Sequence, residues 1–500
     1  APAPRQELAR PAAPDLADDD PLGPAAAPAA AAQQPEPEVA SGGVLSLATR
    51  VEYSALPRGS TQDIFGLVTV TAAETPEPSG ASDAPPPRQP MDVVCVLDVS
   101  GSMMGDKLRL VQDAMRFVVQ QAEPSDRVSI VSFNHAASRL MRLRRMDAEG
   151  KNDAATAALR LVAGGGTSIA AGLDVALAVM EQRRQRNKVS AVLLLTDGQD
   201  GSAGAQVPRL VARAHDAGCG LYAFGFGADH DAALLSEIAE QARTPFTFVE
   251  DVEHIRDAFA GAVGGLASVV AQNVELSLAC RAPLKAVHTP FAVQRTSETH
   301  ATVTIPDIFA GERRDVLVEL ATPVLAASAQ AVLLEASLQY TDLQRGVALQ
   351  TPTVAMATEL CEEPQPELEP DEEVTAQRER VEVTRALKEA SACSDQGQFE
   401  AAQKLLSSTE ERLRSSKKQT KMSPALLLEL QDAHVRMQSR SSWEQGGRAE
   451  VKDAAQMHTM QRCTNVNISS KSAVSKVSKQ IYCSSGAHKA LRTSQASGSA

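Results

Sequence analysis

Between residues 91 and 265 the chain alternates two kinds of segment, and this alternation restricts the fold more than any other feature. Short apolar runs of strand length are each followed by a longer amphipathic segment. The apolar runs are Val93–Leu97, Val128–Phe133, Ala191–Leu195 and Leu221–Phe226. The amphipathic segments are Lys107–Gln121, Ile169–Arg184, Val207–Ala217 and Ala232–Gln241. The pattern predicts an α/β doubly wound domain, in which helices cover both faces of a parallel sheet.

Oxygen-bearing side chains follow two of these apolar runs. Asp98, Ser100 and Ser102 alternate in the loop after the first run, and Asp197 follows the third run. Open parallel sheets bind ligands outside the carboxyl ends of their strands, so these residues lie where a site is expected. Thr167, in a glycine-rich loop, adds another oxygen donor. Carboxylates and hydroxyls are hard ligands that suit an octahedral cation such as Mg²⁺.

These five residues resemble the metal-ion-dependent adhesion site (MIDAS) of the von Willebrand factor A domain. The resemblance implies that Asp98, Ser100, Ser102, Thr167 and Asp197 surround one Mg²⁺ or Mn²⁺. It also implies that an acidic group from a protein partner completes the metal's shell. A simpler interpretation remains open, in which the two serines and Thr167 cap helices and Asp197 begins a turn.

Three further motifs extend the resemblance. They are Thr196–Asp200, Phe224–Asp231 and Ser442–Arg448. Together they are similar to A-domain proteins with a C-terminal "Vwaint" region, a group that includes the plant wavy-growth RING-type ubiquitin ligases. The likeness runs from about Leu45 to about Cys463. Those ligases carry a zinc-binding RING before the A domain, whereas here no Cys precedes Cys95 and no Cys-x-x-Cys pair occurs. The resemblance therefore does not imply ligase activity.

The composition indicates which kinds of partner the chain binds and in which compartment it works. A net charge of −13 and an aromatic content of 3% argue against nucleic-acid binding. The 7 cysteines are odd in number and scattered, which is typical of free thiols in a reducing compartment. No apolar run is long enough for a membrane span, and no secretory signal is visible. We expect an intracellular, cytoplasmic protein.

The segments that flank the A domain predict a second, β-rich unit. Short strands at Val274–Leu278, Ala301–Ile305, Val316–Leu320, Val332–Tyr340 and Val347–Leu349 are typical of a β-sandwich. Val44–Thr71 contains two more runs of strand length. We expect these to join the later strands, which makes the A domain an insertion in the sandwich. The alternative, an isolated N-terminal hairpin, would be marginally stable in water.

Helix-forming residues dominate beyond the sandwich. Val374–Ser391 and Phe399–Ser415 predict a helical hairpin, and Pro424–Gln438 a further helix. A tetratricopeptide-like peptide groove is one interpretation, but such arrays need about three repeats. A helical buttress or a dimer surface is the simpler one.

The chain is thus predicted to be multidomain, with the following organisation. Residues 1–41 form a disordered Ala/Pro-rich segment, 42–73 the N-terminal sandwich strands, 74–90 a linker, 91–268 the A domain, 269–360 the β-sandwich, 361–373 an acidic linker, 374–463 the helical Vwaint-like region and 464–500 a basic disordered tail.

The sequence favours a metal-dependent protein-binding module, not an enzyme, whose partner supplies an Asp or Glu to the metal. One alternative is a substrate-recruiting component of a ubiquitin-ligase pathway, with the RING on another chain. Metal-assisted hydrolysis at the same site is a third hypothesis, although no general base is positioned by the sequence.

Overall fold

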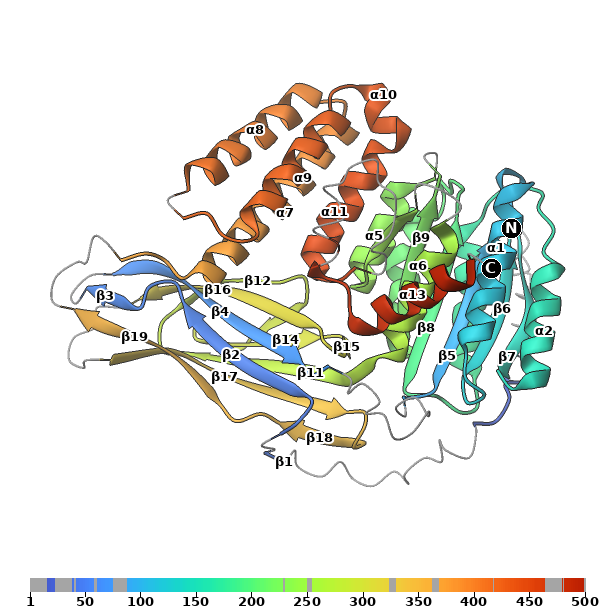
Figure 1. Cartoon of the computed structure of the whole chain (residues 1–500), viewed down its shortest axis with the longest axis horizontal. Helices are drawn as coiled ribbons and strands as arrows, with labels where there is room; N and C mark the ends of the chain where they lie inside the picture. The colour runs from blue at the N-terminus through green and yellow to red at the C-terminus, as the bar shows by residue number, and fades with distance from the viewer. Residues whose placement is uncertain are drawn as a thin grey trace, which may run out of the picture.

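The computed structural model describes most of the chain and divides it into three packed parts. The residues described are 16–22, 38–39, 42–57, 61–74, 88–227, 230–249, 254–322, 330–361, 368–416, 418–463, 479 and 481–498. A β-sandwich lies at one end of the molecule and an α/β domain at the other, and a helical layer covers the junction (Figure 1). No helix in these ranges is long and apolar enough to cross a membrane.

The α/β domain is built on a six-stranded sheet. Its strands, in the order β10-β9-β8-β5-β6-β7, are Phe246–Val249, Gly220–Phe226, Val189–Thr196, Met91–Asp98, Arg127–Phe133 and Ala137–Arg145. All neighbours are parallel except β6 and β7. Every residue of β5, β6 and β8 is buried, as expected for strands covered on both faces.

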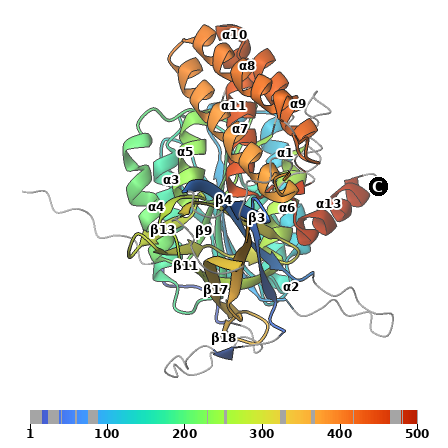
Figure 2. The same ribbon diagram turned by 90° about the vertical axis from the view of Figure 1, so that its left-hand side faces the viewer.

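Helices cover both faces of this sheet, as predicted. The two groups of helices lie on opposite sides of the sheet in Figure 2. One side carries α1 (Asp106–Gln121), α2 (Ala148–Leu159) and α6 (Ile255–Ala267), and the other carries α3 (Ile169–Gln182), α4 (Val207–Asp216) and α5 (Ala232–Ala242). The side chains of β5 alternate between the two cores: Val93 and Cys95 pack with α1 and α6, whereas Val94 and Val96 pack with α3. The doubly wound fold is confirmed.

The α/β domain is inserted in the β-sandwich, as the sequence predicts. Strand β4, before the insertion, pairs antiparallel with β16 along its whole length. The four-stranded sheet has the order β12-β16-β4-β2, with strands Leu284–His288, Arg313–Thr322, Gln62–Ala72 and Leu45–Val51. The second sheet contains β1 (Glu38–Val39), β3 (Ala55–Pro57), β11 (Val269–Cys280), β13 (Ala292–Arg295), β14 (His300–Ile305), β15 (Ile308–Phe309), β17 (Gln330–Asp342), β18 (Val347–Gln350) and β19 (Val354–Cys361).

The helical layer contains the predicted hairpin and further helices. Its members are α7 (Glu372–Asp395), α8 (Phe399–Ser415), α9 (Ser423–Arg436), α10 (Arg440–Ser442) and α11 (Arg448–Met460). Trp443 is 1% exposed within their shared core, and its indole donates a hydrogen bond of 3.0 Å to Asp395. Helix α7 packs on the sandwich through Val374, whereas α11 packs on α5 and β10 of the α/β domain. The layer therefore braces both other parts.

The prediction of disorder before residue 42 is wrong for residues 16–22. Leu16 lies in the core beside α3. Asp19 accepts a hydrogen bond of 2.7 Å from the fully buried Arg127, which also forms a bidentate pair with Asp92. A buried guanidinium needs anionic and carbonyl partners, and this segment supplies two of them, the Asp19 carboxylate and the Asp20 carbonyl. Most other residues of the predicted disordered segment lie outside the described part.

The prediction of a disordered tail is wrong for its last part. Residues 485–498 form helix α13 (Ser485–Gly498), which packs along α6. A Cβ added to Gly264 would lie 2.5 Å from the Cβ of Ala490, and one added to Gly486 would lie 2.5 Å from the carbonyl oxygen of Gly264. The absence of these side chains lets the two helices approach closely, and close packing stabilises the tail helix.

A turn between β15 and β16 joins the three parts. The buried carboxylate of Glu312 pairs with Arg314 of β16 at 2.8 Å and with Arg462, beyond α11, at 2.7 Å. The backbone amide of Phe309 also donates to Glu312. The pKa of Glu312 lies below its ordinary value because, although burial acts to raise it, the charges of Arg314 and Arg462 outweigh that effect.

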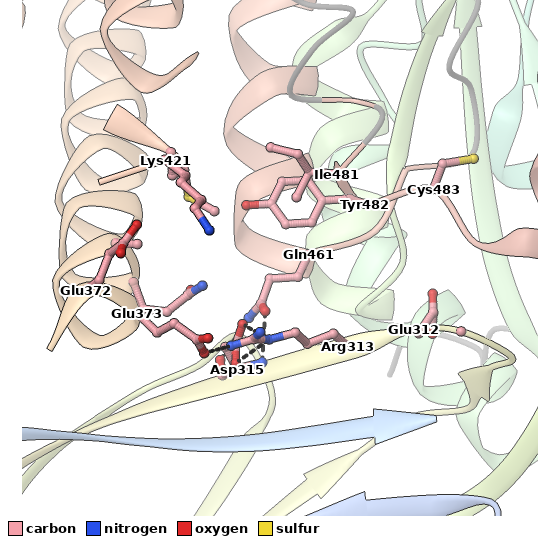
Figure 3. A pocket seen from close by; sticks show the side chains of 14 residues that line it. Glu312, Arg313, Asp315, Glu372, Glu373, Lys421, Gln461, Ile481, Tyr482 and Cys483 are labelled. Atoms are coloured by element: carbon pink, nitrogen blue, oxygen red, sulfur yellow. Dashed lines mark hydrogen bonds and ion pairs between the residues drawn. The ribbon is translucent and has the colours of Figure 1, made fainter. Parts of the chain in front are cut away.

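A cavity of about 300 Å³ lies at the same junction (Figure 3). Arg313, from β16, pairs in it with Asp315 at 2.9 Å and with Glu373 of α7 at 2.7 Å. The side-chain amide of Gln461 bonds both the backbone N–H and the carbonyl of Asp315 at 2.9 Å. None of the five predicted metal ligands lines this cavity.

Replacing Glu312 by Gln should lower the free energy of unfolding by about 3–5 kcal/mol at neutral pH, because Arg314 and Arg462 would stay buried without the carboxylate that both of them contact. A carboxylate with a depressed pKa stabilises the fold above its unfolded-state pKa, and this stabilisation is lost as the pH falls through its folded-state value. The difference between wild type and Glu312→Gln, measured by urea denaturation, should therefore shrink in acid. The control is Glu335→Gln, which breaks an exposed pair with Arg281 and should cost about 0–1 kcal/mol. Equal effects of the two substitutions would contradict this role of Glu312.

Replacing Asp19 by Ala should lower the unfolding free energy by about 1–3 kcal/mol, because Arg127 would lose one buried partner but keep Asp92. The matched control is Asp18→Ala, since Asp18 is 44% exposed and pairs with Arg139 at the surface. It should cost less than about 1 kcal/mol. Urea denaturation of both variants measures the difference, and a silent Asp19→Ala would show that residues 16–22 do not stabilise the domain.

Candidate metal centre

Asp98 is the last residue of β5 and lies between the ends of β6 and β8. Its side chain is fully buried. One carboxylate oxygen accepts a hydrogen bond of 2.7 Å from the backbone N–H of Ser100, and the other accepts a bond from the hydroxyl of Thr196. These two bonds fix the direction of the carboxylate at the carboxyl edge of the sheet.

Ser100 and Ser102 continue from Asp98 toward Asp197. Their hydroxyl oxygens lie 3.0 Å apart, and the Ser102 hydroxyl donates a bond of 2.7 Å to Oδ1 of Asp197. The loop then turns at Gly105, whose φ of 81° is a conformation that glycine adopts without strain, and α1 begins at Asp106. The oxygens of both loops thus form one continuous hydrogen-bonded group.

Thr167 reaches this group through loop-to-loop bonds. The Gly101 N–H donates to the Gly165 carbonyl at 2.9 Å, and the Gly164 N–H donates to the Val99 carbonyl at 2.8 Å. A Cβ added to Gly198 would lie 2.8 Å from the Thr167 hydroxyl oxygen and 3.2 Å from Oδ2 of Asp98. Both oxygens therefore face the same glycine, and any larger residue at 198 would crowd them.

All five predicted residues are brought together at this edge of the sheet. The capping interpretation does not account for them, because α1 begins after Gly105 and α3 after Ser168, and neither helix has a side-chain cap. The donor set consists of two carboxylates and three hydroxyls, which suits a hard divalent cation such as Mg²⁺ or Mn²⁺. Within the described residues no group of three or more His, Cys, Asp or Glu side chains could hold a metal.

The electrostatics of the site also favour a cation. Burial raises the pKa of Asp98, and the nearby charge of Asp197 raises it further, while the hydrogen bonds from Thr196 and Ser100 act in the opposite direction. A positive ion next to Asp98 would offset both unfavourable effects. The residues present therefore fit the group that the sequence motif implies.

Three residues that the motif did not identify complete the surroundings. Lys107, near the start of α1, pairs with Oδ2 of Asp197. Thr196 donates to Asp98, as described above. Asp200 accepts bonds from the backbone N–H groups of Ile169 at 2.9 Å and of Ser202 at 3.0 Å. Asp200 thus holds the Thr167 loop against the Asp197 loop. In the sequence, only the position of Lys107, shortly after Ser102 and in the first turn of the expected helix, could have indicated that a residue outside the motif contacts the site.

Comparisons with known proteins agree with this part of the fold. The family model for the von Willebrand factor type A domain matches residues 92–260, which include all five candidate ligands. The chain is 31% identical over 273 residues to the E3 ubiquitin-protein ligase WAV3 of Arabidopsis thaliana, an alignment that covers 50% of this chain and 33% of that protein. It is 38% identical over 128 residues to the E3 ubiquitin-protein ligase WAVH1 of the same plant, covering 22% of this chain and 18% of the ligase.

These relatives confirm the resemblance that the motifs indicated, but the chain spans only about a third of the length of WAV3. Two solved structures share most of the fold. A von Willebrand factor type A protein from Catenulispora acidiphila superimposes with a TM-score of 0.60 at 15% identity, covering 85% of this chain and 97% of its own. The ArnB paralog VWA2 from Sulfolobus acidocaldarius does so with a TM-score of 0.52 at 14% identity, covering 83% and 99%. At these identities the likeness concerns the fold alone.

Mg²⁺ or Mn²⁺ should raise the melting temperature of the wild-type chain, because an ion that binds only the folded state stabilises it by about 2.7 kcal/mol at a hundred times its dissociation constant. Asp98→Ala and Asp197→Ala should each abolish this metal-dependent increase. The control is Asp113→Ala, which removes a half-exposed carboxylate of α1 that pairs with Arg116 and should leave the increase intact. Thermal melts with and without each metal measure it. If both site variants keep the full increase, the ligand assignment is wrong.

Proposed function

Because residues 92–260 form a von Willebrand factor type A domain, we propose that this chain is a metal-ion-dependent protein-binding module. Asp98, Ser100, Ser102, Thr167 and Asp197 would hold one Mg²⁺ or Mn²⁺, and a partner's Asp or Glu would complete its shell. The observation that carries the proposal is the continuous group of oxygens from Asp98 through the two serines to Asp197, with Thr167 facing the same glycine.

The metal, when bound, supplies a positive centre that takes up an anionic ligand. The chain's own residues orient the ligands of the metal. Backbone and hydroxyl bonds hold both carboxylates in fixed directions before any ligand arrives. Because the donors need little rearrangement, little of the binding energy is spent on ordering them. Neither carboxylate is free to act as a general base, so we propose binding and not turnover.

Exposed apolar side chains beside the site support a protein partner over a small anion. Met104, on the loop after Ser102, is 65% exposed, and Val162, just before the Thr167 loop, is 76% exposed. The bond from the Gly164 N–H to the Val99 carbonyl joins the two loops that carry them. A partner could therefore cover apolar surface around its acidic residue, and such a buried centre contributes much of the affinity of an interface.

The similarity to WAV3 and WAVH1 favours one biological setting for this activity. We propose as the second candidate function that the chain recruits substrates in a ubiquitin-ligase pathway, with a RING supplied by another chain. The second function would use the same metal site as the first and would differ only in what happens to the bound partner, which would be ubiquitinated. Copurification of a RING protein would support this second function. A set of partners without ubiquitin-pathway proteins would contradict it and favour protein binding alone.

Capture of partners by the wild-type chain should require Mg²⁺ and be lost in EDTA. Asp98→Ala should lose the same partners, while Asp113→Ala should keep them. Replacing the responsible Asp or Glu of the partner by Asn or Gln should weaken binding by about 2–5 kcal/mol, because a desolvated charge pair is broken. Quantitative binding with the purified partner measures this loss. Partners retained equally in EDTA would show that the chain binds them through another surface, such as the helical layer.

A further inference from the structure

We propose that Lys107 sets the charge of the metal centre: it weakens binding of the divalent cation and strengthens binding of an anionic ligand to the loaded site. Lys107 would therefore determine that the partner's contribution is an acidic side chain. This inference rests on the proposed function, because it concerns the same five ligands.

Lys107 is the second residue of α1, one turn beyond the serine loop, and its side chain is directed at the site. Its ammonium group pairs with Oδ2 of Asp197, whose side chain is fully buried, while the lysine side chain itself is 27% exposed. The ammonium also lies 5.8 Å from the ring centroid of Phe226, at the end of the neighbouring strand β9. A partly buried ion pair of this kind is screened less by solvent than a surface pair.

The two oxygens of Asp197 serve different partners. Oδ1 accepts the bond from Ser102 and so faces the candidate ligands, whereas Oδ2 faces Lys107. The ammonium thus leaves the metal-facing oxygen in place while it neutralises the carboxylate. The hydrogen-bond donors to the Asp98 carboxylate, the Ser100 N–H and the Thr196 hydroxyl, are uncharged. Lys107 therefore compensates one of the two site carboxylates but not the other.

The charge balance gives the functional consequence. Among the five candidate ligands and Lys107, two carboxylates and one ammonium leave a single negative charge, so a divalent cation makes this group positive by one charge. The Asp200 carboxylate is not one of these ligands and is held by the backbone N–H groups of Ile169 and Ser202. One carboxylate from a partner then neutralises the loaded centre. Without Lys107 the loaded centre would already be neutral, and the attraction for an anion would fall. The same ammonium repels the incoming metal, since like charges a few ångströms apart interact strongly in a poorly solvated site.

A purely structural lysine would behave differently. If Lys107 only held Asp197 in position, its loss would loosen the ligand set and weaken metal binding. If it sets the charge, its loss strengthens metal binding and weakens anion binding. The two roles therefore predict opposite signs for the change in metal affinity, and only the second predicts opposite changes for metal and anion.

The experiment uses the full chain, Mn²⁺ as the metal and acetate as the anion. Mn²⁺ affinity is measured by calorimetry. Acetate binding to the Mn²⁺-loaded protein is measured by the relaxation rate of water protons, because this rate falls when acetate displaces water from the ion. The variants are Lys107→Met, which removes the charge, and Lys107→Arg, which keeps it. Arg109→Met is the matched control, because Arg109 is 70% exposed on the same helix and pairs with Asp106 outside the site.

Lys107→Met should bind Mn²⁺ roughly tenfold more tightly or better and should bind acetate roughly tenfold more weakly. Lys107→Arg and Arg109→Met should each stay within about threefold of the wild type for both ligands. Unchanged or weaker Mn²⁺ binding by Lys107→Met, or unchanged acetate binding, would overturn the inference. If wild-type protein binds no Mn²⁺, or Asp98→Ala binds it equally well, the proposed metal site itself fails, which is a distinct result.

Discussion

The arrangement of the three parts depends on one buried carboxylate in a short turn. Glu312 holds Arg314 of the sandwich and Arg462 of the segment beyond the helical layer. The same turn bonds backbone to backbone with Ala72 at the end of β4 and with Ser268 at the end of α6. The end of β4 and the residue after α6 therefore both bond to the turn that carries Glu312. A buried charge tolerates few alternative geometries, so this cluster fixes how the domain emerges from the sandwich.

The fixed frame matters because the candidate site is assembled from three separate loops. Asp98 and Asp197 follow neighbouring parallel strands, so the sheet alone places their backbones side by side. Thr167 has no strand beneath it and depends on loop bonds, including those that Asp200 makes to the amide of Ile169. The glycine at 198 leaves room for Thr167 and Asp98 to approach each other. Backbone geometry thus does most of the positioning, and side chains adjust it.

Electrostatics connects this geometry to the proposed activity. Two buried carboxylates lie near one ammonium, and the pKa of Asp98 is raised by burial and then by the charge of Asp197. In the proposed function, a divalent cation would offset this unfavourable electrostatic energy, and the loaded centre would attract one more anion.

The sequence by itself determined the doubly wound domain, its insertion in a sandwich and the five candidate ligands. The fold was predictable because strand and helix periodicities are local, and Asp98 and Asp197 because residues at the ends of parallel strands must meet at one edge of the sheet. The full set, including Thr167, followed from the resemblance to the metal-site motif. The sequence could not place residues 16–22 or α13, whose order comes from contacts with distant partners such as Arg127 and Gly264. It also could not reveal the pairing of Lys107 with Asp197. Only the tertiary structure decided these features, because a buried charge or a close helix contact is stabilised by groups far apart in the chain, which leave no local pattern.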